Sequence, residues 1–137
     1  MTTWIVACDG CAVPNPGRIS VGVWLVAPDG RETTLARLTD VTGCCNEAEA
    51  LALIAALDKA QELGAEELDI QCDSDVVVKH VGRGESSRVH RLERRYAQAR
   101  ALLASFRAVK LRWVPRHKNQ RADALARAAA GQHRSSC

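Results

Sequence analysis

The sequence of 137 residues contains no long apolar run. Its apolar stretches are far shorter than the roughly 18 consecutive residues that a membrane-spanning helix needs. The N-terminal segment "WIVAC" is followed at once by Asp9, which excludes the apolar core of a secretory signal peptide. Internal repeats and low-complexity segments are also missing, and the last residues, "GQHRSSC", match no lipidation or retention signal. We therefore expect a soluble cytoplasmic protein that does not associate with membranes.

The lack of a secretory signal also bears on the six cysteines, which are Cys8, Cys11, Cys44, Cys45, Cys72 and Cys137. A chain of this length can bury a substantial core without disulfides, so we expect reduced thiols. The alternative is a zinc or redox site, because "CDGC" has the cysteine spacing of both. Cys8 and Cys72, however, each precede an acid at the end of an expected strand. Their side chains should therefore be buried on the opposite face of the sheet.

Hydrophobic residues make up 47% of the chain and charged residues 26%, which is usual for one globular domain. We expect a monomeric domain at residues 1–131 and a short C-terminal tail at 132–137. Residues 1–78 hold 4 lysines and arginines against 13 acids, a net charge of −9, whereas residues 79–137 hold 15 against 3, a net charge of +12. This asymmetry favours a polyanionic partner held by the basic half, with acids elsewhere that hold cations. The alternative is a basic helix face exposed to solvent.

The hydrophobic pattern predicts an opening run of strands, followed by helices that alternate with strands. The expected strands cover residues 3–9, 19–27, 32–39, 67–73 and 108–114, and the expected helices cover 46–64, about 88 to 106, and 120–130. Gly64 and Gly131 are typical of helix ends, and Asn119 can cap the last helix. The first three strands should form an antiparallel meander, and the two later strands, which follow helices, should be parallel. The sequence thus predicts an α/β fold in which a mixed sheet of these five strands is covered by helices.

Four acids stand in otherwise apolar surroundings: Asp9, Glu49, Asp73 and Asp123. Each has an ordinary explanation, since Glu49 can complete a capping box with Asn46, Asp123 can favour a helix dipole, and Asp9 and Asp73 can begin turns. Together they are harder to explain, because clustered carboxylates repel one another unless cations lie between them. Ligands bind beyond the carboxyl ends of parallel strands, where Asp9 and Asp73 are expected. The pattern indicates a site for hard divalent cations that act on a phosphodiester.

Four segments of the chain resemble the type 1 ribonucleases H. They are "DGCAVPNPG" (9–17), "NEAEALALIAAL" (46–57), "CDSDVVV" (72–78) and "WVPRHKNQRADALARAA" (113–129). The resemblance implies a ribonuclease H-like fold, which is a five-stranded mixed sheet with helices on both faces. It also implies an endoribonuclease that hydrolyses the RNA strand of RNA–DNA hybrids, leaving 5′-phosphate and 3′-hydroxyl ends. It also implies that Asp9, Glu49, Asp73 and Asp123 are catalytic and hold two Mg²⁺ or Mn²⁺ ions, one activating a water and one stabilising the leaving oxygen.

The resemblance further implies a set of substrate contacts. Only RNA offers a 2′-hydroxyl, so an enzyme that selects RNA must recognise it. In the family this is done by main-chain and small polar groups after the first acid and by the acid on the first helix, which here are Gly10, Cys11, Asn15, Asn46 and Glu49. We expect further substrate contacts from Ser74, Arg88 and Arg116.

His117 lies in the loop before the last expected helix, where the family has a mobile histidine. The resemblance implies that His117 assists proton transfer or product release, and the ordinary pKa of histidine suits that role. The alternative is a surface histidine, with Arg116 or Lys118 as a cationic substitute.

The chain departs from the family pattern in three places. Cys45 replaces one of two adjacent asparagines, and Asp75 stands where glutamine is common, so substrate contacts should be weaker. The basic, tryptophan-bearing protrusion of larger members is missing, because the segment 81–106 is too short to hold it. An arginine-rich helix is predicted to contact phosphates instead, through Arg88, Arg91, Arg94, Arg95 and Arg100. The alternative for these arginines is a solvated helix face.

A binding module with the same fold and no catalysis is the alternative function. It would recognise hybrid or double-stranded RNA through the basic half of the chain. The complete set of four acids argues against this alternative, because carboxylates that face phosphates weaken the binding of a polyanion. Loss of one acid separates the two functions, since a binding module keeps its affinity and an enzyme loses turnover.

Overall fold

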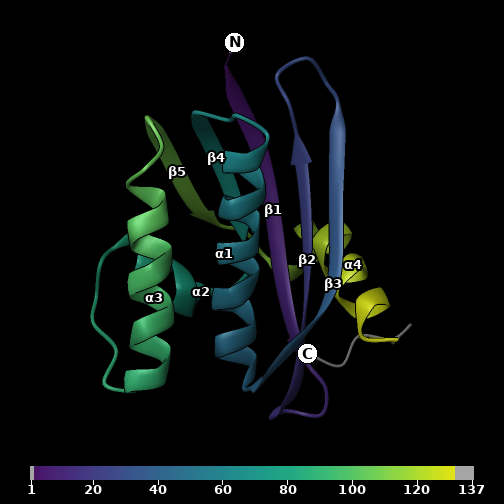
Figure 1. Ribbon diagram of the computed structural model, residues 1–137, viewed down its shortest axis with the longest axis vertical. Coiled ribbons are helices and arrows are strands. Elements are labelled where there is room, and N and C mark those ends of the chain that lie inside the picture. The colour runs from purple at the N-terminus through teal and green to yellow at the C-terminus, as the bar shows by residue number, and fades with distance from the viewer. Residues whose placement is uncertain (1, 132–137) are drawn as a thin grey trace.

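The computed structural model describes residues 2–131, and the expected tail at 132–137 lies outside the described residues. Five strands form one sheet in the order β3-β2-β1-β4-β5 (Figure 1). Their bounds are β1 Thr3–Ala12, β2 Gly17–Val26, β3 Glu32–Gly43, β4 Glu67–Cys72 and β5 Ala108–Trp113. The pairs β1–β2 and β2–β3 are antiparallel, and the pairs β1–β4 and β4–β5 are parallel. The expected mixed sheet, a meander with two parallel strands added, is confirmed.

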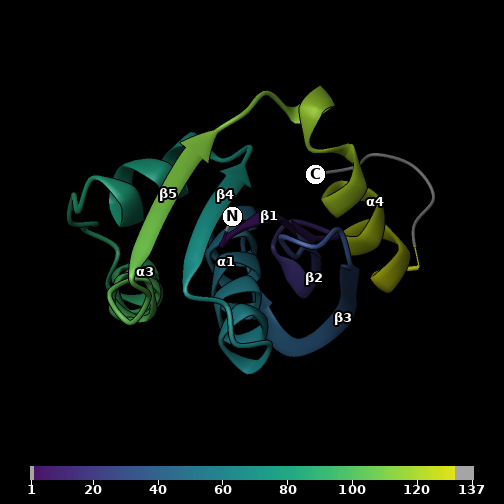
Figure 2. The ribbon, with the colours of Figure 1, turned by 90° about the horizontal axis from the view of Figure 1, so that it is seen from above.

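Helices cover both faces of this sheet, as expected (Figure 2). The main helices are α1 Cys45–Glu62, α3 His90–Leu103 and α4 Gln120–Ala129; short helical turns are α2 Asp75–Val77, η1 Val78–Gly82 and η2 Arg116–Lys118. α1 packs on β1 and β2 and against α3, whereas α4 packs on the other face of β1, β2 and β3. None of the helices within residues 2–131 has the length and apolar character needed to cross a membrane.

Two glycines bring the sheet into main-chain contact with a helix on each face. A Cβ atom at Gly10 of β1 would overlap the main chain of Ala48 in α1. A Cβ atom at Gly22 of β2 would overlap the main chain of Ala122 and Ala126 in α4. Gly22 pairs directly with Asp9 in the β1–β2 register. The distance of both helices from this part of the sheet is therefore set by main-chain contact.

The boundaries of the helices differ from the predictions at a few residues. α1 begins at Cys45 rather than Asn46, and α3 begins at His90 rather than near residue 88. The segment 75–82 is helical and was not expected, because two turns are too short to show a helical period; its start is marked only by Ser74, whose hydroxyl accepts a hydrogen bond from the Val77 N–H at 3.1 Å. Gly64 and Gly131 adopt positive φ angles of 81° and 77° at the ends of their helices, as expected.

The cysteines only partly follow the expectation. Cys8 and Cys72 face each other on β1 and β4, and each is 1% exposed within the core, as predicted. A hydrogen bond with Cys72, together with burial, raises the pKa of Cys8. Cys8, Cys44, Cys45 and Cys72 are free thiols. The prediction of reduced thiols is wrong for Cys11, which is disulfide-bonded, because pairing depends on proximity in the fold and not on sequence spacing. Cys137 lies outside the described residues.

Candidate active site

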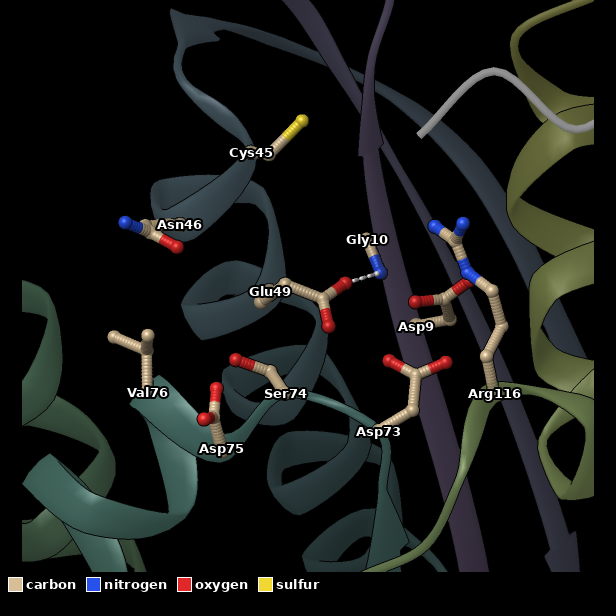
Figure 3. A pocket seen from close by; sticks show the side chains of 10 residues that line it. All are labelled: Asp9, Gly10, Cys45, Asn46, Glu49, Asp73, Ser74, Asp75, Val76 and Arg116. Atoms are coloured by element: carbon tan, nitrogen blue, oxygen red, sulfur yellow. Dashed lines mark hydrogen bonds between the residues drawn. The ribbon is translucent and has the colours of Figure 1, made fainter.

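Three of the four singled-out acids meet where the parallel pairing of β1 with β4 ends, just after Cys8 and Cys72. The expected end of the first strand at Asp9 is wrong, because β1 continues to Ala12 in its pairing with β2. Asp9 lies on β1, Asp73 directly follows β4, and Glu49 lies in the second turn of α1. One carboxylate oxygen of each can be chosen so that all three atoms lie within 4.8 Å of one another. Figure 3 shows the three side chains converging from separate elements. They line a cavity of about 220 Å³.

The negative charges of these three acids favour the binding of a cation between them. Asp9 is 4% exposed, and burial, together with the neighbouring charges of Asp73 and Asp123, raises its pKa to about 7. Burial and the charge of Asp9 likewise raise the pKa of Glu49 well above its ordinary value. Within residues 2–131, no lysine, arginine or histidine forms an ion pair with Asp9, Glu49 or Asp73. The three neighbouring carboxylates offer only oxygen atoms as ligands, which suits a hard divalent cation.

Glu49 is held in place by β1 and not by a helix cap. The N–H of Gly10 donates a hydrogen bond of 2.6 Å to the Glu49 carboxylate (Figure 3). The expected capping box of Asn46 and Glu49 is wrong, because α1 begins one residue earlier, with Cys44 at the cap position and no side-chain hydrogen bond there. The close approach of β1 to α1 at Gly10 thus also delivers the donor that orients Glu49.

Asp123 lies beside this cluster and has a cationic partner of its own. It is 7% exposed, lies in the first turn of α4, and forms an ion pair of 2.7 Å with Arg127 one turn later. A hydrogen bond with Asp123 contributes to the raised pKa of Asp9, which places the two carboxyl groups next to each other. Asp123 is not among the three acids whose oxygens lie within 4.8 Å of one another. The four predicted acids are therefore arranged as a group of three with a fourth at its edge.

The structure divides the other predicted site residues into two groups. Gly10, Asn46, Ser74 and Arg116 line the cavity, together with Cys45, Asp75 and Val76, which were not predicted as contacts. Arg116 reaches from η2 towards the Asp9 side of the cavity (Figure 3). Cys11, Asn15, Arg88 and His117 do not line it. The Asn15 side chain instead accepts a hydrogen bond of 3.1 Å from the Cys45 N–H, so it links the β1–β2 loop to the start of α1.

Three of the five arginines expected to contact phosphates are tied to acids of the protein. Arg91 and Arg95 form ion pairs of 2.6 Å and 3.0 Å with Glu47, which is 1% exposed. Arg100 pairs with Glu93 at 3.0 Å. Within residues 2–131, Arg88 and Arg94 have no such ion pair. Of the five arginines expected to contact phosphates, Arg88 and Arg94 are therefore the two that remain candidates.

Sequence reasoning missed one residue that touches the acid cluster. Asn119 was expected only to cap α4, but its side chain makes no cap hydrogen bond. It is 2% exposed and lies between Cys8, inside β1, and Asp73. A buried asparagine at the start of a helix has the same sequence pattern as an ordinary cap, so no local signal distinguishes the two.

Comparisons with solved structures support the assignment of the fold. The crystal structure of RNase H1 from the archaeon Halobacterium salinarum superposes with a TM-score of 0.88 at 34% identity, covering 94% of this chain and 98% of that one. The N-terminal RNase H domain of a Mycobacterium tuberculosis protein gives 0.83 at 32% identity, covering 96% and 95%. An RNase H1 isolated from compost, solved in complex with an RNA/DNA hybrid, gives 0.78 at 26% identity, covering 92% and 95%.

Comparisons of sequence identify the family. The ribonuclease HI of Halobacterium salinarum is 37% identical over 126 residues, which are 88% of this chain and 61% of that protein. A bifunctional protein of Mycobacterium tuberculosis is 36% identical over 124 residues, which are 89% of this chain and 34% of that protein. The chain thus spans between one third and two thirds of the length of these relatives. The profile of the reverse transcriptase-like family matches residues 7–129. The chain therefore belongs to the reverse transcriptase-like family, in its ribonuclease H-like form.

Proposed function

We propose that this protein is a ribonuclease H, an endonuclease that hydrolyses the RNA strand of RNA–DNA hybrids and leaves 5′-phosphate and 3′-hydroxyl ends. The observation that carries the proposal is the group of three carboxylates, Asp9, Glu49 and Asp73, on a fold shared with solved RNase H1 structures. Without a cation this arrangement is unfavourable, because burial and mutual repulsion raise the pKa values of Asp9 and Glu49. A binding module for polyanions has no use for it.

The acids fit a pair of Mg²⁺ or Mn²⁺ ions. Asp9, Glu49 and Asp73 would hold them, with Asp123 at the edge of the site. Two such ions supply an activated water and stabilise the leaving oxygen of a phosphodiester. The chain itself holds the carboxylates in position, because the Gly10 N–H orients Glu49, and Asp9 and Asp73 directly follow Cys8 and Cys72, the last paired residues of the parallel strands β1 and β4. None of the acids needs to act as a nucleophile.

The groups around the cavity suit an RNA strand. Asn46 and Ser74 offer small polar side chains. Gly10 also lines the cavity, but the space that its missing side chain would need is filled by the main chain of α1 and not by a substrate. Arg116 adds a cation at the Asp9 side, where we assign it a phosphate contact. His117 is exposed on η2 and outside the cavity, so the proposed role in proton transfer or product release requires this short turn to move. An RNase H1 of the same fold was solved with an RNA/DNA hybrid, which supports the same class of substrate here. The domain limit at residue 131, the monomeric state and the cytoplasmic location stay predictions.

The test is cleavage of an end-labelled RNA–DNA hybrid with Mg²⁺, Mn²⁺ or a chelator. We expect cutting of the RNA strand only, in the presence of metal only, and its loss in Asp73→Asn. Asp75→Asn is the matched control, because Asp75 lines the same cavity, carries the same charge, and is not one of the three grouped acids. Its activity should stay within about threefold of the original protein, as is usual for an exposed substitution.

DNA duplex and RNA duplex of the same sequence complete the design. If the hybrid is bound but is not cut with Mg²⁺ or with Mn²⁺, the proposal is contradicted and the binding module is favoured. Equal losses in Asp73→Asn and Asp75→Asn would show that negative charge in general, and not the group of three acids, is required.

A further inference from the structure

Asn119 connects three elements that carry the acids of the site. Its side-chain Nδ2 donates one hydrogen bond of 2.9 Å to the Cys8 carbonyl, next to Asp9, and one of 3.4 Å to Oδ2 of Asp73. Its main-chain carbonyl accepts a hydrogen bond of 3.1 Å from the Asp123 N–H. The residue is 2% exposed, so water does not compete for these contacts.

The amide group fixes the direction of its donor towards Asp73. An NH₂ group has two hydrogens in one plane, and the Cys8 carbonyl belongs to the middle of a sheet and cannot move. With one hydrogen committed to that carbonyl, the second is left for Asp73 Oδ2, which lies 3.4 Å from the same nitrogen. Within residues 2–131, the other carboxylate oxygen of Asp73 accepts no hydrogen bond and stays available to a cation.

The neutrality of asparagine matters as much as its geometry. Asp73 lies beside two other carboxylates and is half-exposed, so repulsion favours rotation of its side chain towards solvent. A lysine or arginine would hold it but would also cancel the negative charge that attracts a divalent cation. An amide holds the carboxylate and leaves that charge intact.

We propose that Asn119 is a positioning residue that orients Asp73 for cation binding by donating Nδ2–H to it from a support fixed on β1. This inference rests on the proposed function, since it concerns the same metal site. It assigns to Asn119 a contribution to metal affinity, in addition to any contribution to the stability of α4.

The test is binding of Mn²⁺ in the absence of substrate, followed by electron paramagnetic resonance of the free ion. We expect Asn119→Ala to weaken Mn²⁺ binding by about 10-fold, the effect typical of hydrogen-bond partners of metal ligands. The Mn²⁺ concentration for half-maximal cleavage should rise by a similar factor, while KM for the hybrid at saturating Mn²⁺ should change by less than about twofold.

Ser20→Ala is the matched control for a purely structural role. Ser20 is also fully buried, and its hydroxyl donates a hydrogen bond of 2.8 Å to the Ala126 carbonyl, so it ties α4 to the sheet through a contact that involves none of the four acids. This substitution should lower the urea midpoint and leave Mn²⁺ affinity within about twofold. If Asn119→Ala does not fold, Asn119→Ser replaces it, and the same weakening is expected.

The possible outcomes distinguish a failure of the role of Asn119 from a failure of the proposed function. Unchanged Mn²⁺ affinity in the Asn119 variant, with loss of binding in Asp73→Asn, would overturn the role of Asn119 and leave the metal site intact. Equal weakening in Asn119→Ala and Ser20→Ala would also overturn it, because docking of α4 would then explain both. Absence of Mn²⁺ binding that depends on Asp73 in the original protein would overturn the proposed function itself.

Discussion

Two glutamates in the first turns of α1, only two positions apart, have opposite surroundings. Glu47 is 1% exposed and lies between Arg91 and Arg95, which approach both of its carboxylate oxygens from α3. Glu49 faces Asp9 and Asp73 and receives one hydrogen bond, from the Gly10 N–H. The protein therefore supplies cations to the buried Glu47 and withholds them from the half-buried Glu49.

Under the proposed function, this difference separates an acid that holds the fold together from an acid that would hold a metal ion. A buried ion pair stabilises only when its partners are in place, and Glu47 has both. Glu49 is a like-charge neighbour of two aspartates, and its pKa is raised by burial and by the charge of Asp9. Acids of the second kind indicate where a cation from solution belongs.

The largest expected effect on this comparison between Glu47 and Glu49 is the loss of cleavage when the charge of Glu49 is removed. We expect Glu49→Gln to lower hybrid cleavage by at least roughly 100-fold, which is about 2.7 kcal/mol of barrier, because one of the three carboxylates proposed to hold the metal is lost. Single-turnover rates at saturating Mg²⁺ measure the effect. Glu47→Gln should retain activity within about threefold, and a similar loss in both variants would contradict the distinction.

The reverse effect is expected on stability. Glu47→Gln should lower the free energy of unfolding by about 2 kcal/mol, because it leaves Arg91 and Arg95 without a counter-charge at a buried position. Urea unfolding in chelator gives the value. Glu62→Gln is the control: Glu62 forms an exposed pair with Lys59, and its loss should cost less than about 0.5 kcal/mol. Equal costs would show that the Glu47 cluster is an ordinary surface pair.

The pH dependence of stability gives a smaller effect with a definite sign. The pKa of Asp9 is about 7 in the folded protein, against an ordinary value of 3.8, so the folded state binds the proton more tightly. The free energy of unfolding of the metal-free protein should therefore fall as pH rises from about 4 to 7. Asp9→Asn lacks this titration, and its stability relative to the original protein should increase by about 2 kcal/mol between pH 5 and pH 7.5.

Urea titrations of both proteins in chelator measure this difference. Added Mg²⁺ should reduce it, because a bound cation favours the ionised carboxylate of the original protein. A difference that does not vary with pH would mean that Asp9 is ionised throughout.

The smallest expected effect separates the arginines of α3. Arg94→Gln should raise KM for the hybrid by about twofold to threefold, lessen its salt dependence, and leave stability unchanged, because Arg94 has no acid partner in the described residues. Arg95→Gln should instead lower stability by about 1 kcal/mol through loss of the pair with Glu47. The two arginines are adjacent, so salt titrations of KM and urea midpoints compare them directly. An equal rise in KM in the Arg94→Gln and Arg95→Gln variants would show that Arg95 also contacts the substrate.

The sheet and the acid group follow from local patterns. Alternating apolar residues, the turn at Asp29-Gly30 and the glycines that end the helices predict the order of elements, and right-handed connections then bring Asp9 and Asp73 to one edge. Glu49 was identified because a charge in an apolar helix start is unusual. Each of these signals lies within a few residues of the position it concerns.

The contacts that were missed join residues far apart in the chain. Glu47 and Arg95 are 48 positions apart, and Asn119 and Cys8 are 111 apart. An arginine on a helix has the same local sequence whether it faces a phosphate or a buried glutamate. A buried asparagine likewise looks like a helix cap, and the disulfide of Cys11 leaves no trace in the spacing of cysteines. Such pairs depend on the final packing and cannot be predicted from periodicity.

The two glycines that bring β1 and β2 against their helices have a consequence for how this activity can be lost. A methyl group at Gly10 or Gly22 would push α1 or α4 away from the sheet, and Glu49 or Asp123 would move with its helix. Every acid would remain in the sequence while the cluster opened. A related protein can therefore keep all four acids and still be inactive. Inspection of the four acids alone would misclassify such a protein, so the two glycines should be part of any sequence pattern used to recognise an active member of the family.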